Sequence, residues 1–183
     1  QKTVYIVRGG PGTGKSVVAI NLLAECIHNG YMAQYITSNA APRNVYSAML
    51  QQGYKKSEIK ALFQSSGTFH TRKKNDLQIA IVDEAHRLRK KSGMFQNQGE
   101  DQVKEIINAS IFSVFFIDRN QRVTFNDAGT IDKIRNFAQE QNSLIYEGVL
   151  ESQFRCNGSD GYLAWIDNAL QIAETANYDG FEG

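Results

Sequence analysis

The sequence lacks the features that mark secreted, zinc-binding or membrane-spanning proteins. Among its 183 residues are only two cysteines, Cys26 and Cys156, which lie far apart and stand in neither a C-x-x-C nor a metal-ligand spacing. No apolar run approaches the roughly 20 residues that cross a bilayer, and the first twenty residues do not have the pattern of a signal peptide. We therefore expect reduced cysteines, no membrane association and a cytoplasmic location.

The chain also lacks internal repeats and low-complexity tracts. Hydrophobic residues make up 42% of it and charged residues 21%, which excludes a disordered or fibrous protein and is enough to build a buried core. The length is that of one domain of ordinary size with, at most, the beginning of a second.

The chain has little net charge, but its basic and acidic residues are concentrated in different halves of the sequence. The total is +1, yet residues 1–91 hold 14 Lys and Arg against 5 Asp and Glu, whereas residues 92–183 hold 6 against 14. The basic half contains three clusters, Lys55-Lys56-Lys60, Arg72-Lys73-Lys74 and Arg87-Arg89-Lys90-Lys91. Such clusters can follow a phosphate backbone, although a solvated basic surface balanced by the acidic half is an equally simple interpretation.

Strand and helix patterns alternate along the chain. Apolar strand patterns cover residues 3–8, 31–37, 77–82, 111–117 and 144–150, and helical spacing covers residues 16–29, 43–52, 56–63, 101–109, 127–141 and 159–173. Residues 64–75 predict a loop with a short strand at 68–70, and residues 90–101 predict a mobile loop. The alternation predicts an α/β fold with a mostly parallel, doubly wound sheet and helices on both faces.

One stretch between the first strand and the first helix carries a specific chemical signal, Gly9-Gly10-Pro11-Gly12-Thr13-Gly14-Lys15-Ser16. It matches the phosphate-binding pattern G-x-x-x-x-G-K-[ST] in the context that this pattern requires. Backbone N–H groups must approach a triphosphate closely, so the loop needs residues without Cβ atoms. Lys15 would place its charge on the β- and γ-phosphates, and the Ser16 hydroxyl would bind the Mg²⁺ that bridges them. The alternative, a glycine-rich turn without chemical function, is rare in this context.

Two later strand patterns run directly into polar residues. The strand at 77–82 is followed by Asp83-Glu84-Ala85-His86. A nucleoside triphosphatase needs one carboxylate to hold Mg²⁺ and another to position the attacking water, and Asp83 suits the first role and Glu84 the second. The simpler alternative is a strand end with exposed acids. The strand at 111–117 is followed by residues 118–121, where Gln121 either senses the γ-phosphate or belongs to an ordinary turn.

Five segments together resemble motifs I, Ia, II, III and IV of superfamily 1 helicases, in the right order. They are residues 10–16, Thr37-Ser38-Asn39-Ala40-Ala41, residues 83–86, Asp118-Arg119-Asn120-Gln121 and Gln153-Phe154-Arg155. The chain is especially similar to the helicase-like ATPase domain grouped with the Schlafen group 3 proteins. This resemblance implies a three-layer RecA-like P-loop domain that binds ATP and Mg²⁺ and hydrolyses the nucleotide.

The resemblance also implies a role for individual residues. The nucleotide would be bound by Gly10, Pro11, Gly12, Thr13, Gly14, Lys15 and Ser16, and Mg²⁺ by Ser16 and Asp83. Lys15 and Glu84 would take part in catalysis, together with Gln121, which would couple the nucleotide to nucleic acid, and Arg155, which would approach the γ-phosphate from the far side of the cleft. Ser38 and Asn39 would lie along the backbone of single-stranded DNA or RNA.

Two positions depart from the family pattern. Ile117 stands where a glycine usually precedes motif III, and His86-Arg87 stands where motif II often ends in Gln-Arg, so we expect His86 to share in the coupling. We expect residues 1–150 to form the RecA-like domain and residues 151–183 to begin a second motor domain or to pack on the first as an extension. Because motifs V and VI are missing, this chain alone should not unwind a duplex.

Other interpretations of the phosphate loop stay open. One is a nucleotide-binding switch or scaffold that gates a protein partner, and another is a P-loop kinase, which is less favoured because no basic lid or acceptor-binding motif accompanies the loop. DNA and RNA remain equal candidates, since phosphate contacts do not distinguish them. ATP and GTP also remain equal candidates, because the contacts to the base would lie upstream of Gln1 or in a second domain. The sequence does not indicate the oligomeric state.

Overall fold

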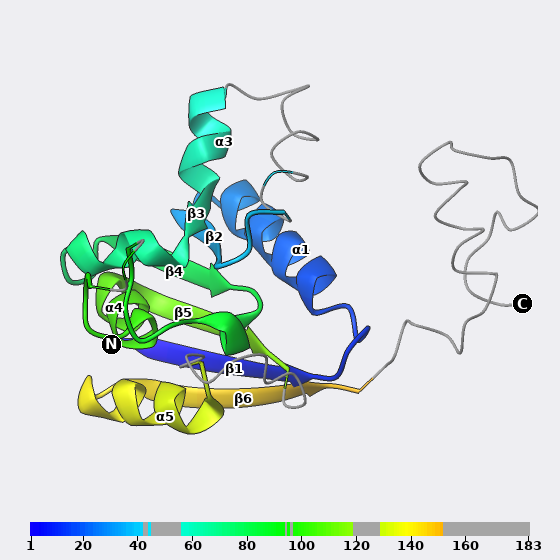
Figure 1. Cartoon of the computed structure of the whole chain (residues 1–183). Helices are drawn as coiled ribbons and strands as arrows, with labels where there is room; N and C mark the ends of the chain where they lie inside the picture. Colours follow the sequence, from blue (N-terminus) through cyan, green and yellow to red (C-terminus); the bar gives the residue numbers. More distant parts are fainter. Residues whose placement is uncertain (42–43, 45–55, 94, 96, 119–128, 152–183) are drawn as a thin grey trace, which may run out of the picture.

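The structure, a computed structural model, describes residues 1–41, 44, 56–93, 95, 97–118 and 129–151, and within these ranges the chain forms a six-stranded sheet flanked by helices (Figure 1). The strands are β1 (Thr3–Gly9), β2 (Ala33–Thr37), β3 (Phe63–Ser65), β4 (Leu77–Val82), β5 (Ser110–Ile117) and β6 (Leu144–Leu150). The helices are α1 (Lys15–His28), α3 (Lys56–Leu62), α4 (Gln102–Ala109) and α5 (Ile131–Glu140), with 3₁₀ helices η1 (Ser66–Thr71) and η2 (Ala85–Arg87).

The strand order is β3-β2-β4-β5-β1-β6, and every neighbouring pair is parallel. β5 therefore lies between β1, which leads into the glycine-rich loop, and β4, which leads into Asp83. In the register, Phe115 of β5 pairs with Ile6 of β1 on one side and with Val82 of β4 on the other. All these strands end at one edge, so the segments that follow them meet there.

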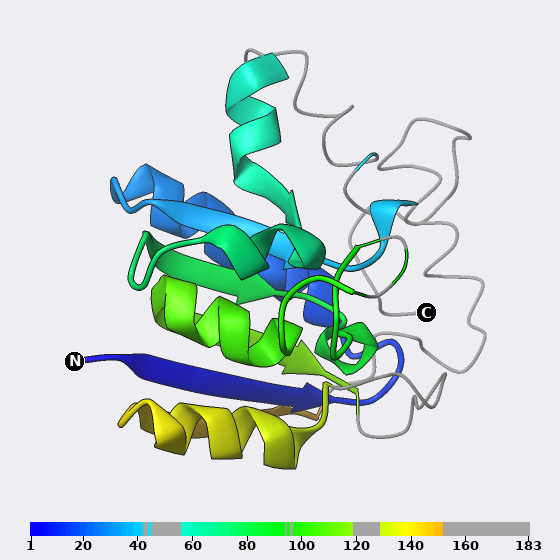
Figure 2. The ribbon, with the colours of Figure 1, turned by 60° about the vertical axis from the view of Figure 1, so that its left-hand side comes forward.

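Helices cover both faces of the sheet (Figure 2). On one face, Ala19, Leu23 and Cys26 of α1 pack against buried residues of the strands. On the other face, α4 and α5 contribute the fully buried Ile106, Ile107 and Ile134. The central strands are buried on both sides, which explains their continuous apolar sequences. The predicted α/β fold with a parallel, doubly wound sheet is confirmed.

Local side-chain hydrogen bonds set where two helices begin. The Asp101 carboxylate accepts a hydrogen bond from the N–H of Val103 at 3.0 Å and caps α4. The Thr130 hydroxyl accepts one from the N–H of Lys133 at 3.3 Å and caps α5. Such caps satisfy backbone donors that the first helical turn leaves unpaired. The helix predicted for residues 127–141 accordingly begins at Ile131.

The segment between α3 and β4 differs from the prediction. Phe63, predicted as the end of a helix, begins strand β3, and the strand predicted at 68–70 is wrong because residues 66–71 form η1. Thr68 donates its hydroxyl to the carbonyl of Ser65 at 2.8 Å, a local bond that favours a tight turn over a strand. This turn buries Phe69, which is 1% exposed, in the core.

Two predicted helices, at 43–52 and 159–173, lie outside the described residues except for residue 44. Residues 90–101 contain a loop, as predicted, closed by an antiparallel bridge between Ser92 and Gln98. Within the described part of the chain, every helix is too short or too polar to cross a membrane.

Replacement of Asp101 tests the contact between α4 and α5. Asp101 is 6% exposed, caps α4 and lies 3.5 Å from the ammonium of Lys133 on α5. Asp101→Ala should lower the free energy of unfolding in urea by about 1–2 kcal/mol. Asp101→Asn keeps a cap acceptor and should cost less. Asp132→Ala, which removes a largely exposed acid from α5, should change stability by less than about 0.5 kcal/mol. Equal losses in the Asp101→Ala and Asp132→Ala variants would contradict this role.

Candidate active site

The glycine-rich loop after β1 has the backbone that its sequence predicts. Gly12 and Gly14 have φ angles of 77° and 76°, a left-handed conformation that favours glycine. At Gly9, a Cβ atom would lie only 2.4 Å from Oγ1 of Thr13, whose hydroxyl donates to the carbonyl of Gly10 at 3.0 Å. The loop is therefore tightly folded on itself, and α1 begins immediately after Gly14.

Lys15 lies over this loop and connects it to β5. Its ammonium donates to the carbonyls of Gly9 at 2.9 Å and Gly10 at 2.6 Å, and lies 3.5 Å from a carboxylate oxygen of Asp118. The Asp118 side chain is 1% exposed at the end of β5. Attraction between these charges is screened little by water because both are largely buried. The strand order thus brings a carboxylate to the lysine of the loop.

Asp83 follows β4 and is fixed by two hydrogen bonds. One carboxylate oxygen accepts from the hydroxyl of Tyr35 at 2.5 Å, and the other accepts from the N–H of Glu84 at 2.8 Å. Tyr35 comes from β2, the neighbour of β4. Asp83 is 1% exposed, so its orientation is set by the protein and not by solvent.

Glu84 combines backbone strain with an unpaired carboxylate oxygen. Its φ of 50° and ψ of 44° place a residue other than glycine in the left-handed region, which costs about 1–3 kcal/mol and is common at functional sites. Its Oε1 lies 3.6 Å from Nε of Arg87, whereas its Oε2 is buried and has no hydrogen-bond partner among the described residues. Buried acceptors of this kind are rare, which makes Glu84 a candidate site residue.

His86 lies close to the same charges. It is 6% exposed, and neither of its ring nitrogens has a hydrogen-bond partner in the part of the chain that the structure describes. Burial lowers the pKa of the imidazole; the Glu84 and Asp118 carboxylates oppose this shift, while the Arg87 and Lys15 cations add to it. The ring is therefore neutral near pH 7.

Sequence reasoning missed Gly129, which packs against the backbone of η2. A Cβ at this buried residue would lie 1.6 Å from the carbonyl oxygen of Ala85 and 3.1 Å from Cα of His86. The chain before α5 therefore passes directly against the backbone of η2, and only a residue without a side chain fits. The sequence does show a glycine next to the helix cap Thr130. It does not indicate which part of the backbone this glycine approaches.

The remaining predicted site residues are distributed as follows. Ser38 and Asn39 lie after β2, where Ser38 Oγ is 3.0 Å from Ser66 Oγ and the Asn39 side chain accepts from the N–H of Ala41 at 3.1 Å. Gln121 and Arg155 lie outside the described residues. Lys15 and Ser16, after β1, and Asp83 and Glu84, after β4, thus lie at the same edge of the sheet, with β5 between the two strands.

The model of the Schlafen group 3 DNA/RNA helicase domain matches residues 2–182. The chain belongs to this family. The match covers nearly the whole chain and confirms the resemblance that the motifs indicated.

Two solved structures are similar to this helicase domain at low identity. The crystal structure of APE1195 has a TM-score of 0.39 and 12% identity, with 100% of this chain and 80% of that chain covered. The structure of AMPPCP-bound DnaA from Aquifex aeolicus has a TM-score of 0.36 and 13% identity, with 100% and 48% covered. Among curated proteins, none matches the chain. The family assignment accordingly comes from the family model.

Replacement of Gly129 tests the contact with η2. Gly129→Ala forces a methyl group into the Ala85 carbonyl, and should lower the free energy of unfolding by about 1–3 kcal/mol or more. Gly67→Ala is the matched control, because the new Cβ would have its nearest neighbour at 3.6 Å and should cost much less. Urea unfolding of both variants measures the difference, and equal stabilities would show that the chain at Gly129 does not lie against η2.

The lowered pKa of His86 predicts a loss of stability in acid. Below the ordinary pKa of 6.5, the unfolded chain binds a proton that the folded His86 binds only at lower pH, so the free energy of unfolding falls as the pH falls below 6.5. In His86→Gln this contribution is absent. The stability of the wild type relative to this variant should therefore decrease between pH 7.5 and pH 5.5, about one unit either side of 6.5. A difference that does not change with pH would contradict a buried, neutral imidazole.

Proposed function

We propose that this chain is the nucleotide-binding core of a helicase-like ATPase that acts on nucleic acid. The observation that supports this most strongly is the pairing, at one sheet edge, of a folded phosphate loop carrying Lys15 with the buried, oriented acids after β4. The loop would cradle the phosphates of ATP with its backbone N–H groups, and Lys15 would exchange its contacts with the Gly9 and Gly10 carbonyls for phosphate oxygens.

The donor set fits Mg²⁺. This ion prefers oxygen ligands and is usually held by one or two carboxylates together with substrate phosphates and water. Asp83 supplies a carboxylate held in place by Tyr35 and the Glu84 N–H, and Ser16 supplies a hydroxyl at the start of α1. Among the described residues, no cluster of three or more His, Cys, Asp or Glu residues forms a complete metal cage, and none is required for this ion. When bound, Mg²⁺ would neutralise phosphate charge during transfer.

Glu84 is the residue that we assign to the attacking water. A general base must be held in position with an oxygen that is free to accept a proton, and Oε2 of Glu84 is a buried acceptor without a partner among the described residues, on a strained backbone. The ion pair with Arg87 engages the other oxygen, so one carboxylate oxygen is left to accept a hydrogen bond from water. Water aligned by this oxygen would attack the γ-phosphate.

Gln121 and Arg155 complete the proposal as the residues that would report the nucleotide state and close the site. We further propose that residues 1–150 form the nucleotide-binding unit, because β6 ends at Leu150 and completes the sheet beside β1. Residues 151–183 would begin a second domain or form an extension packed on the first. Single-stranded DNA or RNA would bind across both units, with Ser38 and Asn39 on this one.

Two substitutions separate binding from hydrolysis. Lys15→Ala removes a charge-assisted contact and should weaken ATP binding about tenfold or more. Glu84→Gln should keep ATP binding and lower Mg²⁺-dependent turnover about 10²- to 10⁴-fold. Glu100→Gln is the control, because it removes an exposed carboxylate that forms an ion pair with Lys104. It should change neither ATP binding nor turnover.

Binding is measured by titration with a fluorescent ATP analogue, and turnover by phosphate release with and without single-stranded DNA or RNA. Unchanged ATP binding in Lys15→Ala would overturn the nucleotide site. Turnover that no nucleic acid stimulates, even in the full-length protein, would favour the protein-gating switch.

A further inference from the structure

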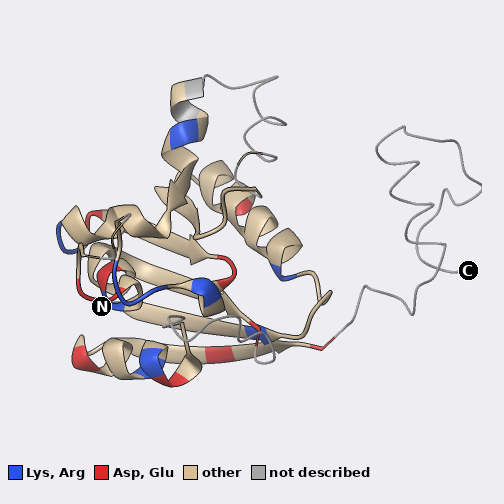
Figure 3. Cartoon of the chain, viewed as in Figure 1, with Lys and Arg blue, Asp and Glu red and all other residues tan. Residues whose placement is uncertain are grey.

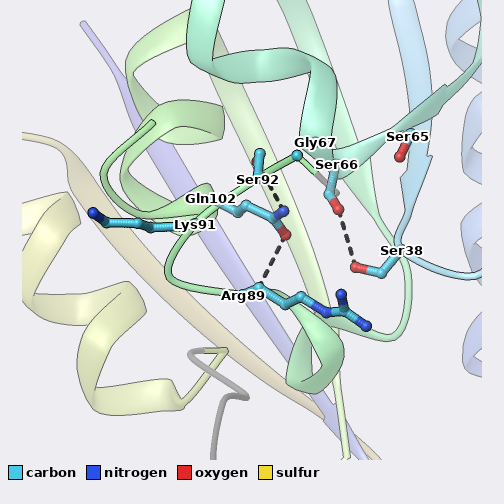
Figure 4. Close-up of a pocket in the computed structure, with 9 residues that line it drawn as sticks. Ser38, Ser65, Ser66, Gly67, Arg89, Lys91, Ser92 and Gln102 are labelled. Atoms are coloured by element: carbon cyan, nitrogen blue, oxygen red, sulfur yellow. Dashed lines mark hydrogen bonds between the residues drawn. The ribbon is translucent and has the colours of Figure 1, made fainter. Parts of the chain in front are cut away.

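A pocket of about 200 Å³ lies near the ends of β2 and β3, on the opposite side of the acidic residues from the phosphate loop (Figure 4). Its walls come from three segments: the residue after β2, the junction of β3 and η1, and the chain from the loop after η2 to the first residue of α4. In the sheet, β1 and β2 are separated by β5 and β4, three strand spacings or about 14 Å. The pocket is therefore a separate site from the phosphate loop.

The lining is suited to an anion. Four of the nine lining residues are serines, two are glycines, and none is acidic. A metal cation would find no carboxylate among them, and an apolar ligand would find no large apolar side chain. Hydroxyl and guanidinium groups both donate hydrogen bonds to oxyanions, so the lining favours a group with several acceptor oxygens.

Arg89 provides the positive charge. In Figure 4 its guanidinium points toward Ser38, whereas the ammonium of Lys91 points away from the pocket. Figure 3 shows the segment after η2 as a run of basic residues. The guanidinium has no ion pair or hydrogen bond with any described residue, while the N–H of Arg89 donates to Gln102 at 3.0 Å. The backbone is thus anchored and the charged group is available.

Buried polar residues hold the pocket walls in place. Gln102 is 4% exposed; its Oε1 accepts from the Arg89 N–H, and its Nε2 donates to Oγ of Ser92 at 3.0 Å. Ser92 is 3% exposed and exchanges two backbone hydrogen bonds with Gln98. On the opposite wall, the hydroxyls of Ser38 and Ser66 are 3.0 Å apart. This network fixes the walls of the pocket and the Arg89 backbone, which lowers the cost of ordering them on binding.

We propose that this pocket binds one phosphate group of a nucleic-acid strand, with the Arg89 guanidinium as its cation and the Ser38 and Ser66 hydroxyls as further hydrogen-bond partners. The choice of a strand rests on the proposed function, whereas the choice of a phosphate rests on the pocket itself. Free inorganic phosphate has the same chemistry, and the experiment below distinguishes the two sources.

The pocket is connected to the proposed catalytic acid by a short chain of contacts. The Ser38 hydroxyl donates to the carbonyl oxygen of Arg87 at 3.3 Å, and Nε of Arg87 lies 3.6 Å from Oε1 of Glu84. A phosphate that draws the Ser38 hydroxyl toward itself would release this carbonyl and alter the position of Arg87. Strand binding would thereby change how Glu84 is held, and with it the rate of ATP turnover.

Fluorescence anisotropy of labelled oligothymidylate, measured without nucleotide, tests the pocket. Arg89→Ala should weaken strand binding about tenfold and lower the slope of log affinity against log salt by about one. Lys90→Ala removes the same charge from the next residue, which is exposed but does not line the pocket, and should weaken binding less than about twofold. Equal effects of the two substitutions would overturn the pocket in favour of general surface charge.

Competition with sodium phosphate identifies the source of the phosphate. Strand binding that is sensitive to Arg89→Ala supports the proposal. Phosphate binding that depends on Arg89, in the absence of strand binding, would overturn the strand and leave a free-phosphate site. Lys15→Ala should retain strand binding, because Lys15 does not line the pocket. A wild-type chain that binds strands but does not bind ATP would refute the proposed ATPase and would leave the pocket in place.

Discussion

Parallel pairing places the carboxyl ends of the six described strands at one edge of the sheet, and the candidate site depends on this constraint. Because β5 lies between β1 and β4, the segments after these three strands are neighbours. The ammonium of Lys15 can then reach Asp118 at 3.5 Å, and the buried His86 is affected by the charges of both. A different strand order with the same sequence motifs would separate the phosphate loop from these groups.

The same edge concentrates features that oppose folding. Glu84 has a strained backbone and a buried oxygen without a partner among the described residues, and His86 is buried without a hydrogen bond in that same part of the chain. Each costs stability, which the continuous packing of α1, α4 and α5 on both faces of the sheet offsets. A ligand that supplies donors and charge at this edge would recover part of that cost, which is why we interpret these features as a site.

Sequence patterns were sufficient for the fold class, for five of the six strands and for the phosphate loop, because each of these depends on local residues and their spacing. The remainder depends on contacts between distant segments. The ion pair between Lys15 and Asp118 requires the strand order, and the close approach of Gly129 to Ala85 requires the path of the chain before α5. The pocket beside Arg89 likewise combines three segments that are far apart in sequence. The error at residues 66–71 arose because a turn that buries Phe69 has the same residue types as a short strand.

The central claim is that this edge binds ATP with Mg²⁺ through a loop already folded to receive it. Its most direct test is the free energy of unfolding measured across a series of ATP concentrations in the presence of Mg²⁺. Since a ligand that binds only the folded chain stabilises it by mass action, the account predicts a gain of about 1.4 kcal/mol for each tenfold increase above the dissociation constant. A free energy of unfolding that stays constant over the whole series would contradict it.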